Sequence, residues 1–314
     1  MGRASCGKNW RLGAREIEHV RIYANPIVTS AVVAGTLLFT AMPVAGQRGQ
    51  RGQGAPQAPA GPTPRLANGK PDLSGHWQNP YTPNMAGRGL VLDPKSRQPL
   101  TFARQGDVLA DAAANTGNST ARRTFDLPYT EWGLKHWKDY DPVNNGEYTA
   151  SCLPFGMSRN INSPHGLVIV HHPDSLAFLF EQNTWFHWVP LNGMKWPADL
   201  PLSWNGVSIG RWDGDTLVIE TTRFNGYTSL DTSGHPHSKE LTLINTFTRT
   251  DAATMQHTVT VHDPKAYTQD WMNVRTWRIK TYPDVIMEYA CEENNLENLV
   301  GGAIKPWKAP ANDD

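Results

Sequence analysis

The chain has 314 residues with 29 basic and 29 acidic side chains, so its formal net charge is zero. This balance, with no basic run outside the N-terminal region, argues against nucleic acid or an anionic membrane surface as a partner. About 250 residues remain for a folded domain, enough to bury roughly three quarters of the unfolded surface without a structural metal.

Residues 1–46 are predicted to be a signal peptide. Ile27–Val44 is apolar but too short and too often interrupted for a comfortable membrane span, and small residues suited to signal peptidase follow at Val44–Gly46. The region before Val20 is unusually long and contains acidic residues, so Val20 is a candidate for the true start. The mature protein is expected to be exported to the periplasm or exterior of a bacterium, without a stable membrane span. A retained membrane anchor is the alternative.

Residues 47–65 are rich in Gly, Gln and Pro and are predicted to form a disordered tether. Residues 66–314 are predicted to form a single β domain. The two cysteines of this domain, Cys152 and Cys291, are expected to form a disulfide in an oxidising compartment. Two unrelated buried thiols are the alternative.

The domain opens with a turn and a short strand within Asn68–Gln78. Helical spacing then predicts two helices, Phe102–Ala114 and Thr130–Tyr140, with Thr130 as the N-cap of the second. From Leu167 onward, alternating β-forming residues between turn residues predict strand after strand. Besides a central hairpin, the expected strands are Leu167–His172, Leu176–Glu181, Thr184–Val189, Glu240–Arg249, Thr254–His262, Trp271–Ile279 and Val285–Cys291. The pattern predicts a mainly β fold, an antiparallel β-barrel or a two-sheet sandwich of about lipocalin size.

The hairpin is the most specific local prediction. Val207–Trp212 and Asp215–Thr221 alternate, and Asp213-Gly214 between them is typical of a type I′ turn. A two-residue loop there places Gly210 near Leu217 on one face. The expected opposite pairs are Arg211 with Thr216, Ile209 with Val218, and Val207 with Glu220.

Six segments in order resemble a family of exported bacterial proteins known mostly as hypothetical proteins. They are Asp72–Trp77, Cys152–Gly156, Ser208–Thr222, Gly234–Leu241, His262–Trp271 and Glu288–Asn295. The resemblance spans nearly the whole mature chain. It implies a single all-β domain in a secreted protein and carries no established activity or site.

The densest titratable cluster is Gly234–Ser238, with Asp231 before it and Glu240 after it. His237 is the candidate general acid or base, since the ordinary pKa of histidine lies near neutral pH, and Asp231 or Glu240 would orient it. His235 and His237 could instead bind a metal, but this spacing without a third ligand is weak, and no metal is expected. A polar loop with no functional role is the other interpretation.

A second catalytic pair is conceivable if Glu288 and Arg275 meet inside a barrel; exposed surface positions are the alternative. Eleven of the twelve Trp lie in the mature domain and could fill the barrel or line a pocket. The candidate substrate-binding residues are Trp196, Trp204, His235, Arg223 and Tyr267. Gly206–Gly210 matches G-x-S-x-G in letters, but Ser208 lies within a predicted strand, where that hydrolase motif is not expected.

Three functions remain open. The first is an enzyme without a cofactor, of hydratase, isomerase or lyase type, acting on a small and partly apolar molecule. The second is a carrier of such a molecule without catalysis, and the third is a structural protein of the cell envelope. The sequence does not choose among them, because one fold supports many functions, and it leaves the oligomeric state open.

Overall fold

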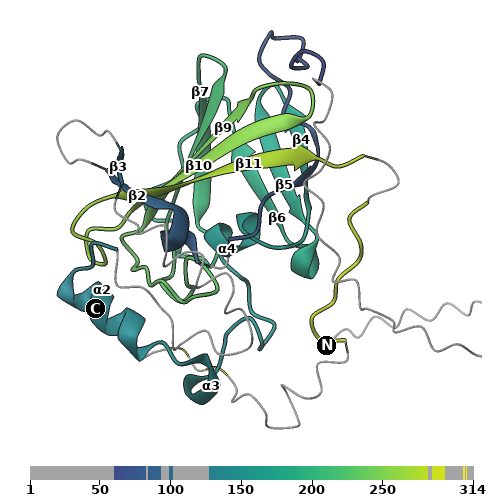
Figure 1. Ribbon diagram of the computed structural model, residues 1–314. Coiled ribbons are helices and arrows are strands. Elements are labelled where there is room, and N and C mark those ends of the chain that lie inside the picture. Colours follow the sequence, from purple (N-terminus) through teal and green to yellow (C-terminus); the bar gives the residue numbers. More distant parts are fainter. Residues whose placement is uncertain are drawn as a thin grey trace, which may run out of the picture. The chain divides into compact units, whose positions relative to one another are not determined.

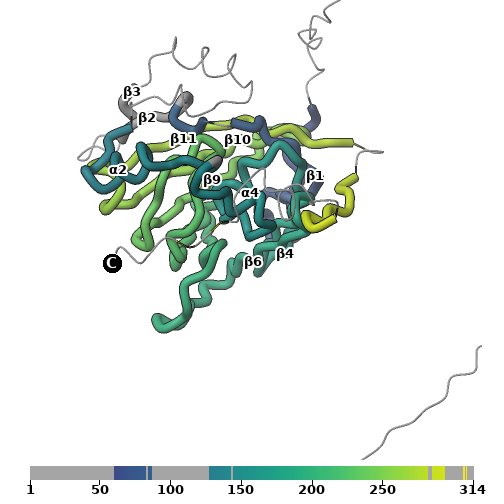
Figure 2. Tube along the Cα trace, turned by 90° about the horizontal axis from the view of Figure 1, so that it is seen from below, coloured from purple at the N-terminus to yellow at the C-terminus, as the bar shows by residue number. Residues whose placement is uncertain are grey.

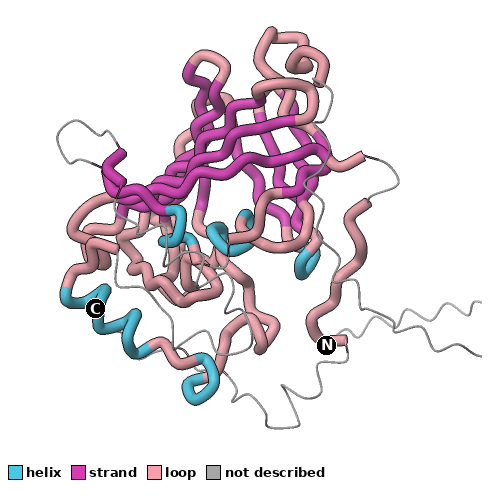
Figure 3. Tube along the Cα trace, in the orientation of Figure 1, coloured by secondary structure: helices cyan, strands magenta, loops and turns pink. Residues whose placement is uncertain are grey.

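The computed structural model describes residues 60–82, 84–92, 99–101, 127–281 and 285–293, together with residues 307 and 309. Eleven strands form one antiparallel sheet, which confirms the prediction of a mainly β fold (Figures 1 and 3). The strands are β1 Gly75–Gln78, β2 Gly89–Leu92, β3 Pro99–Thr101, β4 Leu167–His172, β5 Ser175–Phe180, β6 Phe186–Pro190, β7 Val207–Asp213, β8 Thr216–Thr222, β9 Thr242–Arg249, β10 Thr254–His262 and β11 Trp271–Ile279. The helices are η1 Met85–Arg88, α2 Glu131–Asp139, α3 Pro142–Asn145, α4 Met157–Ile161 and η3 Gln182–Thr184.

The sheet curls into a nearly closed barrel, so the barrel and not the sandwich is correct. Nine strands follow the order β6-β5-β4-β1-β11-β10-β9-β8-β7, and the two end strands, β6 and β7, lie side by side without a backbone ladder between them. Side chains join them instead, because His187 Nε2 lies 2.7 Å from Ser208 Oγ. At Gly210 a Cβ would lie 3.2 Å from Val189 and still closer to Leu191, so the absence of a side chain allows this close approach.

The barrel interior follows from alternation along each strand, since successive side chains point to opposite faces. Phe178, Phe247 and Val259 are buried members of the interior. The indoles of Trp77, Trp271 and Trp277 are fully buried there as well, so these three tryptophans fill the core. Viewed from below in Figure 2, the strands surround this interior.

The β7–β8 hairpin forms with a register two residues away from the predicted one. Asp213 pairs with Thr216, so the two loop residues are Gly214 and Asp215. Only Gly214 of the two has a positive φ, 58°, which fits a type II′ turn with Gly first. Because the shift is an even number of residues, each side chain still points to the predicted face of the sheet. Gly210, however, stands opposite Ile219 and not Leu217.

The last predicted strand, Val285–Cys291, is wrong, since residues 285–290 have no regular structure. The two sides of β11 are already occupied, by β10 on one side and by β1 and β2 on the other. Cys291 instead forms the predicted disulfide with Cys152, with their Cα atoms 5.5 Å apart.

The helical predictions before the main sheet have two outcomes. The predicted helix at Thr130–Tyr140 is confirmed as α2, and the Thr130 side chain accepts a hydrogen bond from Gly133 N. The predicted helix Phe102–Ala114 lies outside the described residues. None of the helices in the described part of the chain has the length and apolar character needed to cross a membrane.

Candidate functional site

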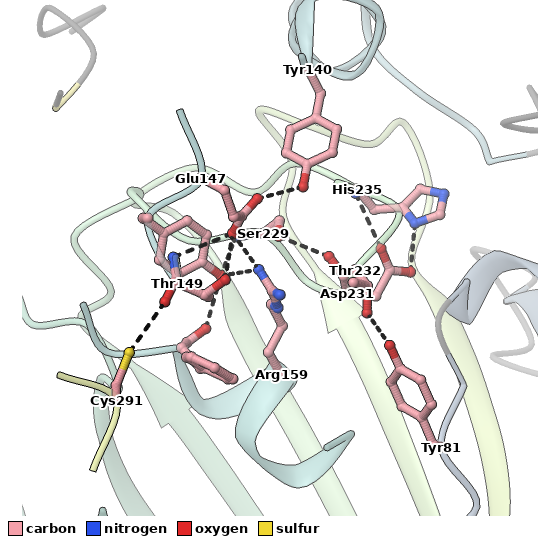
Figure 4. A network of polar contacts seen from close by, with 12 residues as sticks. Tyr81, Tyr140, Glu147, Thr149, Arg159, Ser229, Asp231, Thr232, His235 and Cys291 are labelled. Carbon is pink, nitrogen blue, oxygen red and sulfur yellow. Dashed lines mark hydrogen bonds and ion pairs between the residues drawn. The ribbon is translucent and has the colours of Figure 1, made fainter. Parts of the chain in front are cut away.

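A buried Asp–His pair lies in the connection between β8 and β9. His235 Nδ1 is 2.6 Å from Asp231 Oδ2, and both side chains are inaccessible to solvent (Figure 4). A tight turn brings them together: Leu230 N donates to His235 O, and Gly234, with φ 84°, donates its N–H to Asp231 O. Asp231 Oδ2 also accepts a hydrogen bond from Met85 N at 2.7 Å.

The Asp231 carboxylate is ionised in this setting. Burial by itself would raise its pKa, but the attraction and hydrogen bond of His235, together with the backbone N–H groups of Met85 and His235, outweigh burial and lower the pKa. A carboxylate accepts hydrogen bonds only, so His235 Nδ1 carries a proton and donates it. The pair therefore fixes the orientation of the imidazole ring.

The other nitrogen of His235 points away from Asp231, as Figure 4 shows. Within the described residues, this buried Nε2 has no hydrogen-bond partner. Aromatic rings surround the imidazole: the ring centroids of Trp137, Trp271 and Tyr129 lie 6.1, 6.4 and 6.5 Å from its own. The Asp–His pair thus presents one nitrogen to an apolar, aromatic environment.

Tyr267 belongs to the same aromatic group. Its ring lies 5.4 Å from that of Tyr129 and 5.6 Å from that of Trp271. Its hydroxyl donates a hydrogen bond to Pro236 O at 2.8 Å, and burial raises its pKa well above the ordinary value. The sequence candidates Asp231, His235 and Tyr267 are therefore brought together.

His237, two residues away, has a different environment. Its Nδ1 lies 3.0 Å from Ser238 O and its Nε2 lies 2.5 Å from Thr228 Oγ1. Burial lowers its pKa, so the ring is neutral, with Nδ1 donating and Nε2 accepting. The predicted pairing of Asp231 with His237 does not occur, because the turn places the carboxylate against His235.

A chain of hydrogen bonds leads from this site into the barrel. Met85, whose N–H binds Asp231, accepts a hydrogen bond on its carbonyl from Asn273 Nδ2 at 2.8 Å. Asn273 Oδ1 in turn accepts from Arg275 Nε at 2.9 Å. Arg275 is 2% exposed and stands directly opposite His257 on β10.

The interior therefore has a polar row among its aromatic residues. His257 Nε2 donates to Asn245 Oδ1 at 2.9 Å. Burial and the charge of Arg275 hold the pKa of His257 well below the ordinary value, so the ring is neutral. Within the described residues, His257 Nδ1 and Asn245 Nδ2 have no hydrogen-bond partner.

Other sequence candidates lie elsewhere. Glu288 is exposed in the irregular segment after β11, whereas Arg275 is buried, so the two do not form the interior pair considered above. Trp196 donates its indole N–H to Ser208 O at 2.8 Å, beside the β6–β7 seam, the line where the two end strands of the barrel meet. Trp204 packs against an aromatic group of Tyr148, Tyr227 and Trp307. Arg223 has a φ of 66° at the end of β8 and is half-buried.

Sequence reasoning missed a second buried polar group beside the pair. Arg159 on α4 forms an ion pair with Glu147 at 2.9 Å, and Tyr140 donates to the same carboxylate at 2.7 Å (Figure 4). Burial would raise the pKa of Glu147, but Arg159 and hydrogen bonds from Tyr140 and Thr149 lower it. Tyr140 ends α2, Glu147 follows α3 and Arg159 lies on α4, so no spacing in the sequence indicated them.

No three His, Cys, Asp or Glu side chains gather as a possible metal site in the described residues. Comparison of the chain with protein-family models, with curated proteins and with solved structures finds no match.

Proposed function

We propose that this protein is an exported enzyme that moves a proton on a small, partly apolar molecule. His235 is the acid–base group, and Asp231 is the residue that positions it. The expectation of export is supported by the Cys152–Cys291 disulfide, since such bonds persist in oxidising compartments.

The observation that carries the proposal is the asymmetry of the His235 imidazole. Asp231 holds Nδ1 at 2.6 Å, which leaves Nε2 as the nitrogen that can exchange a proton with a bound molecule. A carboxylate that fixes the tautomer and the orientation of a histidine is a recurrent arrangement in acid–base catalysis. Trp137, Tyr129 and Trp271 would supply an apolar wall for the substrate.

The simplest reaction with this group is the shift of a double bond. Nε2 removes a proton from a carbon next to a carbonyl, the double bond moves by one position, and the same nitrogen returns the proton two carbons further along. The proton and the electrons balance without a cofactor. Hydration of a double bond would use the same group and consume one water molecule, and the reverse elimination would release one.

The test uses a panel of small β,γ-unsaturated ketones in deuterated water, with deuterium uptake followed by NMR. We expect His235→Gln to slow exchange by at least ~100-fold, because a general acid or base typically contributes ~10²–10⁴-fold. His262→Gln is the matched control: His262 also lies 2.6 Å from a carboxylate, that of Asp270, but its side chain is 49% exposed. Equal exchange rates in the parent and in His235→Gln, with both folded by circular dichroism, would contradict the proposal.

Ligand carriage is the second candidate, and the interior of the barrel favours it. His257 Nδ1 is a hydrogen-bond acceptor and Asn245 Nδ2 a donor, and the two lie on side chains that touch. A hydroxyl group could satisfy both atoms, since it donates one hydrogen bond and accepts two. If members of the panel bind, measured by calorimetry, without any deuterium uptake, carriage replaces catalysis.

A further inference from the structure

The outer face of strands β4, β5 and β6 is apolar. Two rows cross the three strands in register: Val168, Leu179 and Phe186 form the first, and Val170, Ala177 and Trp188 form the second. We call these six residues the β4–β6 patch. Phe186 is 68% exposed, Val170 52% and Trp188 43%.

The opposite half of the barrel has a different outer surface. There, most of the outward-facing residues of β8, β9 and β10 are polar, and Val218 and Ile244 are apolar exceptions. The polar ones are Thr216, Glu220, Thr246, Thr248, Gln256, Thr258 and Thr260. An antiparallel sheet with one solvated face is expected to alternate in this way, apolar inside and polar outside. The strands β4–β6 depart from that rule on their outer face, and a contiguous exposed apolar patch marks an interaction site.

The charge around the patch decides what kind of partner it fits. Residues 167–190, which contain all three strands, include neither Lys nor Arg, and Asp174 and Glu181 flank β5. Anionic lipid surfaces and nucleic acids attract proteins through Lys and Arg, so this surface is unsuited to both. An uncharged apolar face rich in aromatic residues matches instead the core of a homodimer interface.

A second copy of this chain offers such a face. From residue 47 onward the chain has 24 basic and 27 acidic side chains, a formal net charge of −3, so the repulsion between two copies through their net charge is small. A two-fold axis brings the same patch of both copies together, and β-sheets pack face to face readily. We propose that the β4–β6 patch is the interface of a symmetric homodimer.

The test is sedimentation equilibrium of the protein from residue 47 onward, with the disulfide intact, over ~1–100 µM, a range that covers moderate to weak association. We expect twice the mass of one chain in the parent, and a dissociation constant at least tenfold higher in Phe186→Lys and in Val170→Lys. Both sites are exposed, so the variants should fold. Val274→Lys on β11 is the matched control, because Val274 is an exposed outer-face residue, 41% accessible, outside the patch.

Two results would overturn the proposal. The parent could remain a single chain at every concentration, or both patch variants could associate as tightly as Val274→Lys. If the single chain also co-sediments with phosphatidylcholine vesicles in a manner that Phe186→Lys abolishes, the patch is assigned to a membrane surface instead.

Discussion

Acidification from pH 7.5 to 5.0 should destabilise this protein through its buried histidines. Burial lowers the pKa of His187 to about 4 and that of His257 well below the ordinary value. His171 and His237 are shifted in the same direction, also by burial. In the unfolded chain each of these rings binds a proton near pH 6.5, whereas the folded state keeps them neutral. Their stability is therefore present above pH 6.5 and is lost as pH falls towards the folded pKa.

The magnitude for His187 follows from its two pKa values. With about 4 folded and an ordinary value near 6.5 unfolded, linkage gives a loss of about 2 kcal/mol between pH 7.5 and 5.0. The lowered carboxylate pKa values of Asp231 and Glu147 affect stability in a different, more acidic pH range. They contribute stability above the unfolded carboxylate pKa, near 4, which is lost only below that value.

The assay is urea unfolding at both pH values, with the disulfide intact, comparing the parent with His187→Gln. The free energy of unfolding of the parent should fall by more than that of the variant, and the difference between the two losses should be about 2 kcal/mol. His172→Gln serves as the control, since His172 is exposed on the same strand as His171, and it should follow the parent. An equal loss in the parent and in His187→Gln would refute the assignment of this pH dependence to burial.

Three further substitutions have definite expectations. Gly210→Val should destabilise the fold by about 1–3 kcal/mol in thermal melts, because its side chain would overlap Leu191; an unchanged melting temperature would contradict this close approach. Replacing Cys152 and Cys291 by Ala should lower the free energy of unfolding by at most about 5 kcal/mol, since the bond closes a loop with a sequence separation of 139, and a stability equal to the parent's would argue against the bond. Arg159→Met should cost about 3–5 kcal/mol in urea unfolding by leaving a buried carboxylate without its cation, while a loss below 1 kcal/mol would mean that the carboxylate is solvated.

The barrel itself was largely predictable from local patterns. Alternation and turn residues located most strands because the side-chain period of a strand is two and needs no knowledge of distant contacts. The register of the β7–β8 hairpin was not predictable from local patterns. Both Asp213-Gly214 and Gly214-Asp215 can form a two-residue hairpin loop, and only pairing with the neighbouring strand, β9, distinguishes them. The prediction of a strand at Val285–Cys291 failed because a strand needs an unpaired neighbour, and β11, the strand before it in the chain, already has partners on both sides.

The candidate site was predictable in part. The cluster around Gly234–Ser238 contains the buried pair, but the sequence favoured His237 and the structure favours His235. The choice depends on two features that local sequence does not show. A tight turn places the Asp231 carboxylate against His235, four residues later, and Met85, from far away in the chain, donates a hydrogen bond to the same carboxylate. The aromatic rings around His235 come from two segments far apart in the chain, Tyr129 and Trp137 at α2 and Trp271 at the start of β11, so nothing in their spacing could indicate the arrangement.

The seam between β6 and β7 has a mechanical consequence. Every other neighbouring pair in the nine-strand order is joined by backbone hydrogen bonds, whereas these two strands are joined by side chains such as His187 and Ser208. The barrel can therefore open between β6 and β7 without breaking any backbone hydrogen bond between strands, and every strand keeps its hydrogen-bonded neighbours. Protonation of His187 would convert its ring into a buried cation beside the seam. Acid thus weakens the side-chain contact between the two strands that no backbone ladder joins, so protonation of His187 loosens the barrel along the β6–β7 seam.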